Sequence, residues 1–225
     1  MSRLTVCVAV ATLFVNIGIV QAAPIHFKFD GMVFDAFADP DDPFGGAIDF
    51  GTSMSGVYTF DTTAVDLITS SDNVGVYSFN GSPYGMTIDI GGVIFDTSET
   101  LTISVANDIA GVDQYTVLAQ QGTPGGLDDF LSMELFLEDW TGTAFSNDDL
   151  LLDASVLDDF IVRDFFMEGV QTIAGTTYQF QVQGITDTFT VPEPTPILLI
   201  GIGLAGLSLT RRRQKRQQFM NNESN

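Results

Sequence analysis

Apolar and polar residues alternate with a period of two over much of the chain between residues 25 and 190. Such alternation places one set of side chains on the core face of a strand and the other set on its solvent face. Glycine, aspartate and threonine separate the alternating segments at intervals typical of short strands joined by turns. The clearest segments are 25–30, 57–60, 76–79, 86–90, 93–95, 101–105, 115–119, 131–138 and 178–183.

These segments predict an all-β fold. About ten short strands, with no amphipathic helix between them, favour a single β-sandwich of jelly-roll type over residues 23–190. Gly91-Gly92 predicts a turn between two of the strands. A Gly-Val-Tyr-Thr-Phe motif at 56–60 returns as Gly-Val-Tyr-Ser-Phe at 75–79. We interpret the pair as strands of one hairpin or of neighbouring sheets, because a solenoid needs at least about three repeats.

The first 22 residues have the pattern of a secretory signal peptide. Arg3 is followed by an almost uninterrupted apolar stretch, and the small residues before Ala23 predict cleavage between Ala22 and Ala23. An uncleaved membrane anchor is the alternative. Cys7 is the one cysteine of the chain and lies in this segment, so the exported domain would contain no disulfide.

The C-terminal end has three unlike parts in a fixed order. Val191, Pro192, Glu193 and Pro194 interrupt regular structure, because proline fixes φ and lacks a backbone donor. A short apolar stretch follows, and with its flanking residues it predicts a membrane-spanning helix at about 195–210. The positive-inside rule keeps the basic cluster that comes next in the cytoplasm. This cluster consists of Arg211, Arg212, Arg213, Lys215 and Arg216, and a polar tail occupies 217–225.

This order of parts resembles the PEP-CTERM sorting signal over residues 191–216. The resemblance implies an exported protein of a Gram-negative bacterium that makes extracellular polysaccharide. It also implies recognition near Pro192–Pro194 by exosortase, a membrane protease of transpeptidase type, after transient anchoring in the membrane. The expected final place is the cell surface or the extracellular matrix. The resemblance concerns sorting and carries no activity for residues 23–190.

Charge narrows the range of partners. The whole chain has a net charge of −21, and residues 23–191 contain 27 acidic residues against two basic ones, Lys28 and Arg163. An acidic surface of this kind repels phosphate backbones, so we expect no nucleic-acid partner.

The residue inventory predicts a non-enzymatic structural or binding protein. His26 is the only histidine, and it lies on the polar phase of the first strand, where we interpret it as a surface residue. The exported domain has no thiol nucleophile, and no Gly-x-Ser-x-Gly elbow or phosphate-binding glycine loop occurs in the chain. Extracellular polysaccharide is the expected partner besides exosortase.

A carboxylate-based enzyme acting on polysaccharide is the alternative. A glycoside hydrolase needs two carboxylates about 5–9.5 Å apart, one of them with a raised pKa. Glu134 and Glu138 lie near phenylalanines that could raise a pKa, and Trp140 could stack on a sugar. An isolated tryptophan in a strand is nevertheless more often packed in the core or at an edge.

Three aspartates between residues 39 and 42 suggest one metal hypothesis. Asp39, Asp41 and Asp42 form an acidic loop with two prolines, and calcium prefers clustered oxygen ligands. The loop does not fit an EF-hand, because Phe44 and Phe50 stand where that motif has glycine and glutamate. Aspartate is also a common turn residue, and acidic surfaces favour solubility. No cofactor is expected, and calcium at these three aspartates stays the one exception.

Overall fold

Strands form at each of the segments that alternation predicts. The computed structural model describes residues 24–39, 41–122, 129–173 and 175–191. The predictions for residues 1–22 and for the tail beyond Val191 lie outside this part of the chain. The described elements are β1 (Ile25–Asp39), β2 (Ser53–Phe60), β3 (Val74–Asn80), β4 (Gly85–Ile90), β5 (Val93–Thr97), β6 (Thr100–Ile109), β7 (Val112–Gln121), β8 (Phe130–Asp139), the 3-10 helix η1 (Ala154–Asp159), β9 (Val162–Ile173) and β10 (Thr176–Thr190).

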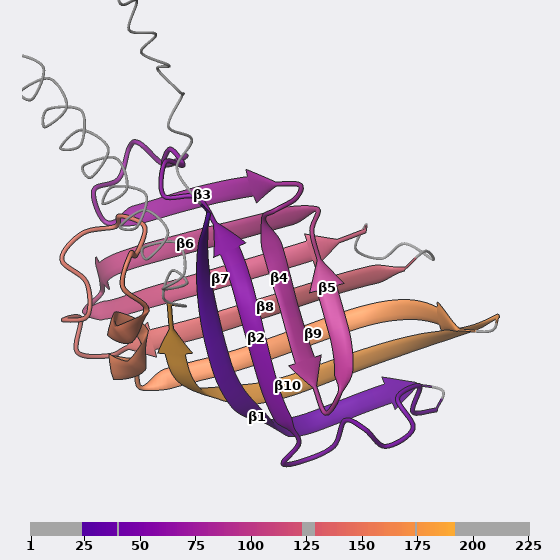
Figure 1. The fold of residues 1–225 in the computed structure, drawn as a ribbon. Helices are drawn as coiled ribbons and strands as arrows, with labels where there is room; N and C mark the ends of the chain where they lie inside the picture. Colours follow the sequence, from indigo (N-terminus) through magenta and orange to yellow (C-terminus); the bar gives the residue numbers. More distant parts are fainter. Residues whose placement is uncertain (1–23, 40, 123–128, 174, 192–225) are drawn as a thin grey trace, which may run out of the picture.

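The strands of the described residues form one antiparallel sheet, in the order β3-β6-β7-β8-β9-β10-β1-β2-β4-β5. The all-β prediction is confirmed. The finer prediction of a jelly-roll sandwich is not confirmed, because the strands form one sheet that is continuous from β3 to β5. It curls so that β2, β4, β5 and the first half of β1 cross in front of β6 to β9 (Figure 1). A single sheet therefore supplies both walls of the core.

A bend in β1 carries the sheet from one wall to the other. The register between β1 and β10 shifts between Asp30 and Gly31 and again between Val33 and Asp35. Such bulges bend a strand and increase its twist. At the first bulge a Cβ on Gly31 would come within 2.2 Å of the carbonyl oxygen of Ile185, so this position requires glycine.

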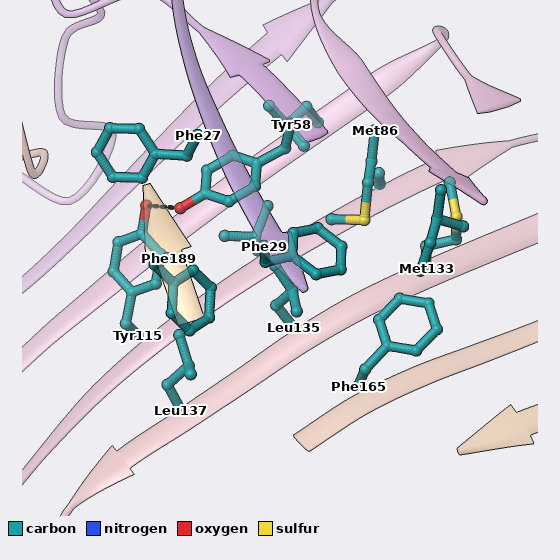
Figure 2. Close-up of a cluster of buried hydrophobic side chains, with 14 of the residues drawn as sticks. Phe27, Phe29, Tyr58, Met86, Tyr115, Met133, Leu135, Leu137, Phe165 and Phe189 are labelled. Carbon is teal, nitrogen blue, oxygen red and sulfur yellow. Dashed lines mark hydrogen bonds between the residues drawn. The ribbon is translucent and has the colours of Figure 1, made fainter. Parts of the chain in front are cut away.

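The core lies between the two walls. Phe27, Phe29, Tyr58 and Met86 approach it from the front wall, and residues of β7, β8 and β9 approach it from behind (Figure 2). The hydroxyl groups of Tyr58 and Tyr115, which are both fully buried, lie 3.2 Å apart and form a hydrogen bond between the walls. Each buried hydroxyl thereby has a partner, as burial in an apolar core requires. The core residues follow the apolar phase of the alternation, which is why the sequence predicts them.

Two local predictions have different outcomes. Gly91 and Gly92 have φ values of 61° and 90°, and they join β4 to β5 at the pair Ile90–Val93, so the predicted turn is confirmed. The repeated motif lies in β2 and β3, but β2 pairs with β1 and β4 whereas β3 pairs with β6. The two copies are therefore not strands of one hairpin.

Two buried aspartates hold the loop after β8 against one end of the core. Asp113 and Asp139 lie opposite each other on β7 and β8, and 0% and 4% of their surfaces are exposed. Asp113 accepts a hydrogen bond from the backbone N–H of Phe145 at 2.8 Å. Asp139 accepts from the N–H groups of Thr141 and Thr143 at 3.0 and 3.1 Å. The hydrogen bond from Thr141 is the main reason why the pKa of Asp139 is lowered.

Candidate functional site

Polar and aromatic side chains meet on the outer face of β8, β9, β10 and the second half of β1. This face points away from the core and from β2, β4 and β5, which lie in front of it in Figure 1. Strand register brings residues far apart in the sequence into neighbouring cross-strand rows. The two rows are Ser132–Glu168–Gln181–Phe37 and Phe130–Val170–Gln179–Asp39.

A groove with a cavity volume of about 360 Å³ crosses these two rows. Phe37 is 63% exposed and forms an open aromatic wall, whereas Phe130 is only 7% exposed. Gln179 and Gln181 present solvent-exposed amides that can both donate and accept hydrogen bonds, and Glu168 adds one carboxylate. We call this feature the outer groove. Its lining residues are Phe37, Phe130, Glu168, Gly169, Val170, Gln179, Phe180 and Gln181.

The face continues from Glu168 towards β7. Glu134 on β8 lies between Leu118 on β7 and Phe166 on β9. Burial among such neighbours is the main cause that raises the pKa of Glu134, and the negative charge of Glu168 raises it further. The carboxylate of Glu168 in the outer groove and that of Glu134 beside the groove therefore influence each other electrostatically.

Asp164 on β9 is likewise a carboxylate between apolar cross-strand neighbours, in the row next to that of Glu134. It lies between Phe136 on β8 and Ile185 on β10. Burial is again the main cause that raises its pKa, and the charge of Glu138 is the second cause. Carboxylates and apolar side chains thus alternate across the centre of the outer face.

Trp140 is not packed in the core, which corrects the first of the two places that the sequence favoured, the core or an edge. It follows β8 directly, and 60% of its surface is exposed. Its indole N–H donates to Glu138 Oε2 at 3.1 Å, and Gln114 Nε2 donates to Glu138 Oε1 at 2.7 Å. These contacts hold an indole ring beside the carboxylates at the end of β8.

No basic side chain compensates these carboxylates on the outer face, as far as the described residues extend. Lys28 pairs with Val57 and lines a separate cavity over the front wall. Arg163 stands next to Asp164 on β9, so strand alternation turns it to the opposite side, and its Nη1 donates to the carbonyl of Asp187 at 2.7 Å.

One aspartate of the calcium hypothesis, Asp42, has a structural role of its own. Asp39 ends β1, and the carboxylate of Asp42 accepts the backbone N–H groups of Phe44 and Gly46. Within the described residues, no group of three or more Asp, Glu, His or Cys side chains is arranged to hold a metal ion. The structure therefore does not bring Asp39, Asp41 and Asp42 together as a ligand set, and calcium binding stays a prediction.

The other predicted residues lie at the edges of the described chain or beyond them. His26 is exposed, as expected, and its Nδ1 is hydrogen-bonded to Thr59 Oγ1 at 2.8 Å. Val191 is 40% exposed and follows the last residue of β10. The remaining sorting-signal, membrane-stop and signal-cleavage residues lie outside the described part. These are Ala22, Ala23, Pro192, Glu193, Pro194, Arg211, Arg212, Arg213, Lys215 and Arg216.

The sequence drew attention to Glu134, Glu138 and Trp140 but not to the outer groove. Phe37, Phe130 and Glu168 were not among its candidates. The nearest local irregularity is Phe136, which stands on the polar phase of an otherwise regular alternation. It does not line the groove, and a single apolar residue on a surface is common, so it gave no signal for the groove itself.

The C-terminal segment places the chain in a class of exported proteins. Residues 190–214 match the family model of the PEP-CTERM protein-sorting motif. The chain is a PEP-CTERM sorting domain-containing protein, and the motif indicates an exported protein that an exosortase processes. No curated protein and no solved structure matches the chain. None of the helices in the described residues is long and apolar enough to span a membrane, and the predicted span at about 195–210 lies outside them.

Proposed function

We propose that the exported protein is a non-enzymatic component of the cell surface or extracellular matrix that binds extracellular polysaccharide through the outer groove. The composition of the groove carries this proposal, since the aromatic rings of Phe37 and Phe130 lie beside the exposed amides of Gln179 and Gln181. Export through a PEP-CTERM motif supports a destination where polysaccharide is available.

The chemistry of a sugar fits such a lining. A pyranose ring has an apolar face of C–H groups, which can pack on an exposed phenylalanine and remove its surface from water. Its hydroxyl groups both donate and accept hydrogen bonds, and glutamine amides and a glutamate carboxylate offer both kinds of partner. The volume of about 360 Å³ lies within the range of small-molecule sites, about 300–1,000 Å³. The groove is thus large enough to bind one or two sugar units of a longer chain.

A glycoside hydrolase is the second candidate, because burial raises the pKa of Glu134 as a general acid requires. Glu134 is not among the residues that line the outer groove, although its neighbour Glu168 is. This separation between the raised pKa and the groove supports binding over hydrolysis.

The test is retention of the purified exported protein on the extracellular polysaccharide of its own host. We expect Phe37→Ala to weaken retention about tenfold or more, because the variant removes the exposed aromatic wall. Phe50→Ala is the matched control, since Phe50 is 78% exposed but lies in the loop before β2, outside the groove.

Four results would contradict the proposal. Retention that survives Phe37→Ala unchanged, or that falls equally in both variants, would separate binding from the outer groove. Failure of the unaltered protein to bind would remove the polysaccharide role. New reducing ends in the incubated polysaccharide would assign the protein to the hydrolase alternative.

A further inference from the structure

We infer that the polysaccharide bound in the outer groove carries protonated amino groups, as a polymer of amino sugars with free amines does. The inference rests on the proposed function and adds to it the chemical class of the ligand. It starts from the lining of the groove and from the charge of the surface that adjoins it.

The first step concerns the wall that Glu168 forms. Glu168 is exposed in the groove, and its charge raises the pKa of Glu134 on the neighbouring strand. Glu168 pairs with Ser132 and Glu134 with Phe166, so the two carboxylates belong to diagonal neighbours, which lie about 7–8 Å apart, and they repel each other across β8 and β9. A ligand with an ammonium group beside Glu168 relieves this repulsion, whereas an uncharged ligand leaves it in place.

The second step concerns the aromatic rings. Phe37 and Phe130 line the groove itself, and Phe166 is the cross-strand neighbour of Glu134. An ammonium group within about 6 Å of an aromatic ring face is attracted by the quadrupole of the ring. Rings and a carboxylate in one groove therefore recognise a cation on a sugar by two independent interactions.

The third step concerns what the surface excludes. Residues 23–191 have a net charge of −25, and Lys28 and Arg163, the only basic residues among them, do not line the groove. A chain of uronic acids would add negative charge against this field, whereas a cationic chain would be steered towards it. Charge complementarity thus selects an amine-bearing glycan over an acidic one.

The experiment compares three polymers of equal length on the exported protein, all of them short enough to be soluble. The probes are chitosan with free amines, its fully N-acetylated counterpart with the same backbone, and a polyuronate. We expect the free-amine polymer to bind at least about tenfold more tightly than the acetylated one and to lose affinity as salt is added. The polyuronate should bind most weakly.

Two variants locate the charge that matters. Glu168→Gln should weaken binding of the free-amine polymer about two- to fivefold, which is the range of an exposed ion pair. The loss for the acetylated polymer should be smaller, because that polymer offers Glu168 no ammonium group. Asp72→Asn is the matched control. Asp72 is exposed in the loop before β3, so this substitution removes the same charge at the far edge of the sheet.

The outcomes distinguish this inference from the function on which it rests. Equal or tighter binding of the acetylated polymer would overturn the inference and leave the proposed function standing. An equal loss in Glu168→Gln and Asp72→Asn would reduce the preference to general electrostatic attraction and would also overturn it. If none of the three polymers binds, the inference fails, whereas the proposed function fails only if the protein is not retained on the polysaccharide of its own host.

Discussion

The two faces of β8 and β9 differ completely although their residues alternate along the same strands. On the inner face Leu135 and Leu137 are fully buried in the core (Figure 2). On the outer face the residues between and beside them are Glu134, Phe136 and Glu138, which are half-buried and lie among other carboxylates and rings. The inner face is determined by the need to exclude water. The outer face is under no such requirement, so its rings and carboxylates are available for binding a ligand.

The largest effect should come from neighbouring substitutions on opposite faces. Leu135→Ala should lower the free energy of unfolding by about 2–5 kcal/mol, because it leaves a cavity in the closed core. Glu134→Ala, one residue away, should change it by no more than about 0.5 kcal/mol. Denaturant unfolding of both variants measures the difference. Similar losses in the two would mean that the outer face is also part of the packed core.

Removal of an aspartate at the end of the inner face should have the next largest effect. Asp139→Ala should cost about 1–3 kcal/mol, because backbone N–H groups of Thr141 and Thr143 lose their acceptor. Asp72→Ala is the control, as an exposed aspartate in a loop. The same unfolding experiment checks this prediction, and equal stability of the two variants would show that the 140–145 loop is held by other contacts.

The sequence predicted the inner face well because burial leaves a local pattern. Leu101, Ile103 and Val105 alternate without interruption, and all three are buried in β6. β9 was not predicted, because Phe165, Phe166 and Met167 are three consecutive apolar residues that hide the period of two. Phe166 contributes to the outer face, so the feature that concealed the strand also belongs to the candidate site.

The outer groove could not be predicted from local pattern at all. Phe37 and Gln181 are far apart in the sequence, and they become neighbours through the register of β1 with β10. That register shifts at the bulges near Gly31, where β1 bends and carries the sheet from one wall to the other. Pairing over such a distance is a property of the whole fold, whereas alternation reports only on each strand.

The smallest expected effect is a difference in pH dependence between the two faces. The pKa of Asp139 is lowered in the folded state, so its contribution to stability is complete above the unfolded value of about 3.9 and is lost as the pH falls through the folded pKa. The pKa of Glu134 is raised mainly by burial, so the folded protein binds this proton more tightly than the unfolded chain does. Stability should therefore increase as the pH falls towards 5 and decrease under stronger acid.

In Glu134→Gln the increase between pH 7 and 5 should be smaller, with a change in melting temperature below about 4 °C, which corresponds to about 1 kcal/mol for a domain of this size. An undiminished increase in that variant would place the titrating group elsewhere, with Asp164 as the next residue to replace, because burial raises its pKa as well.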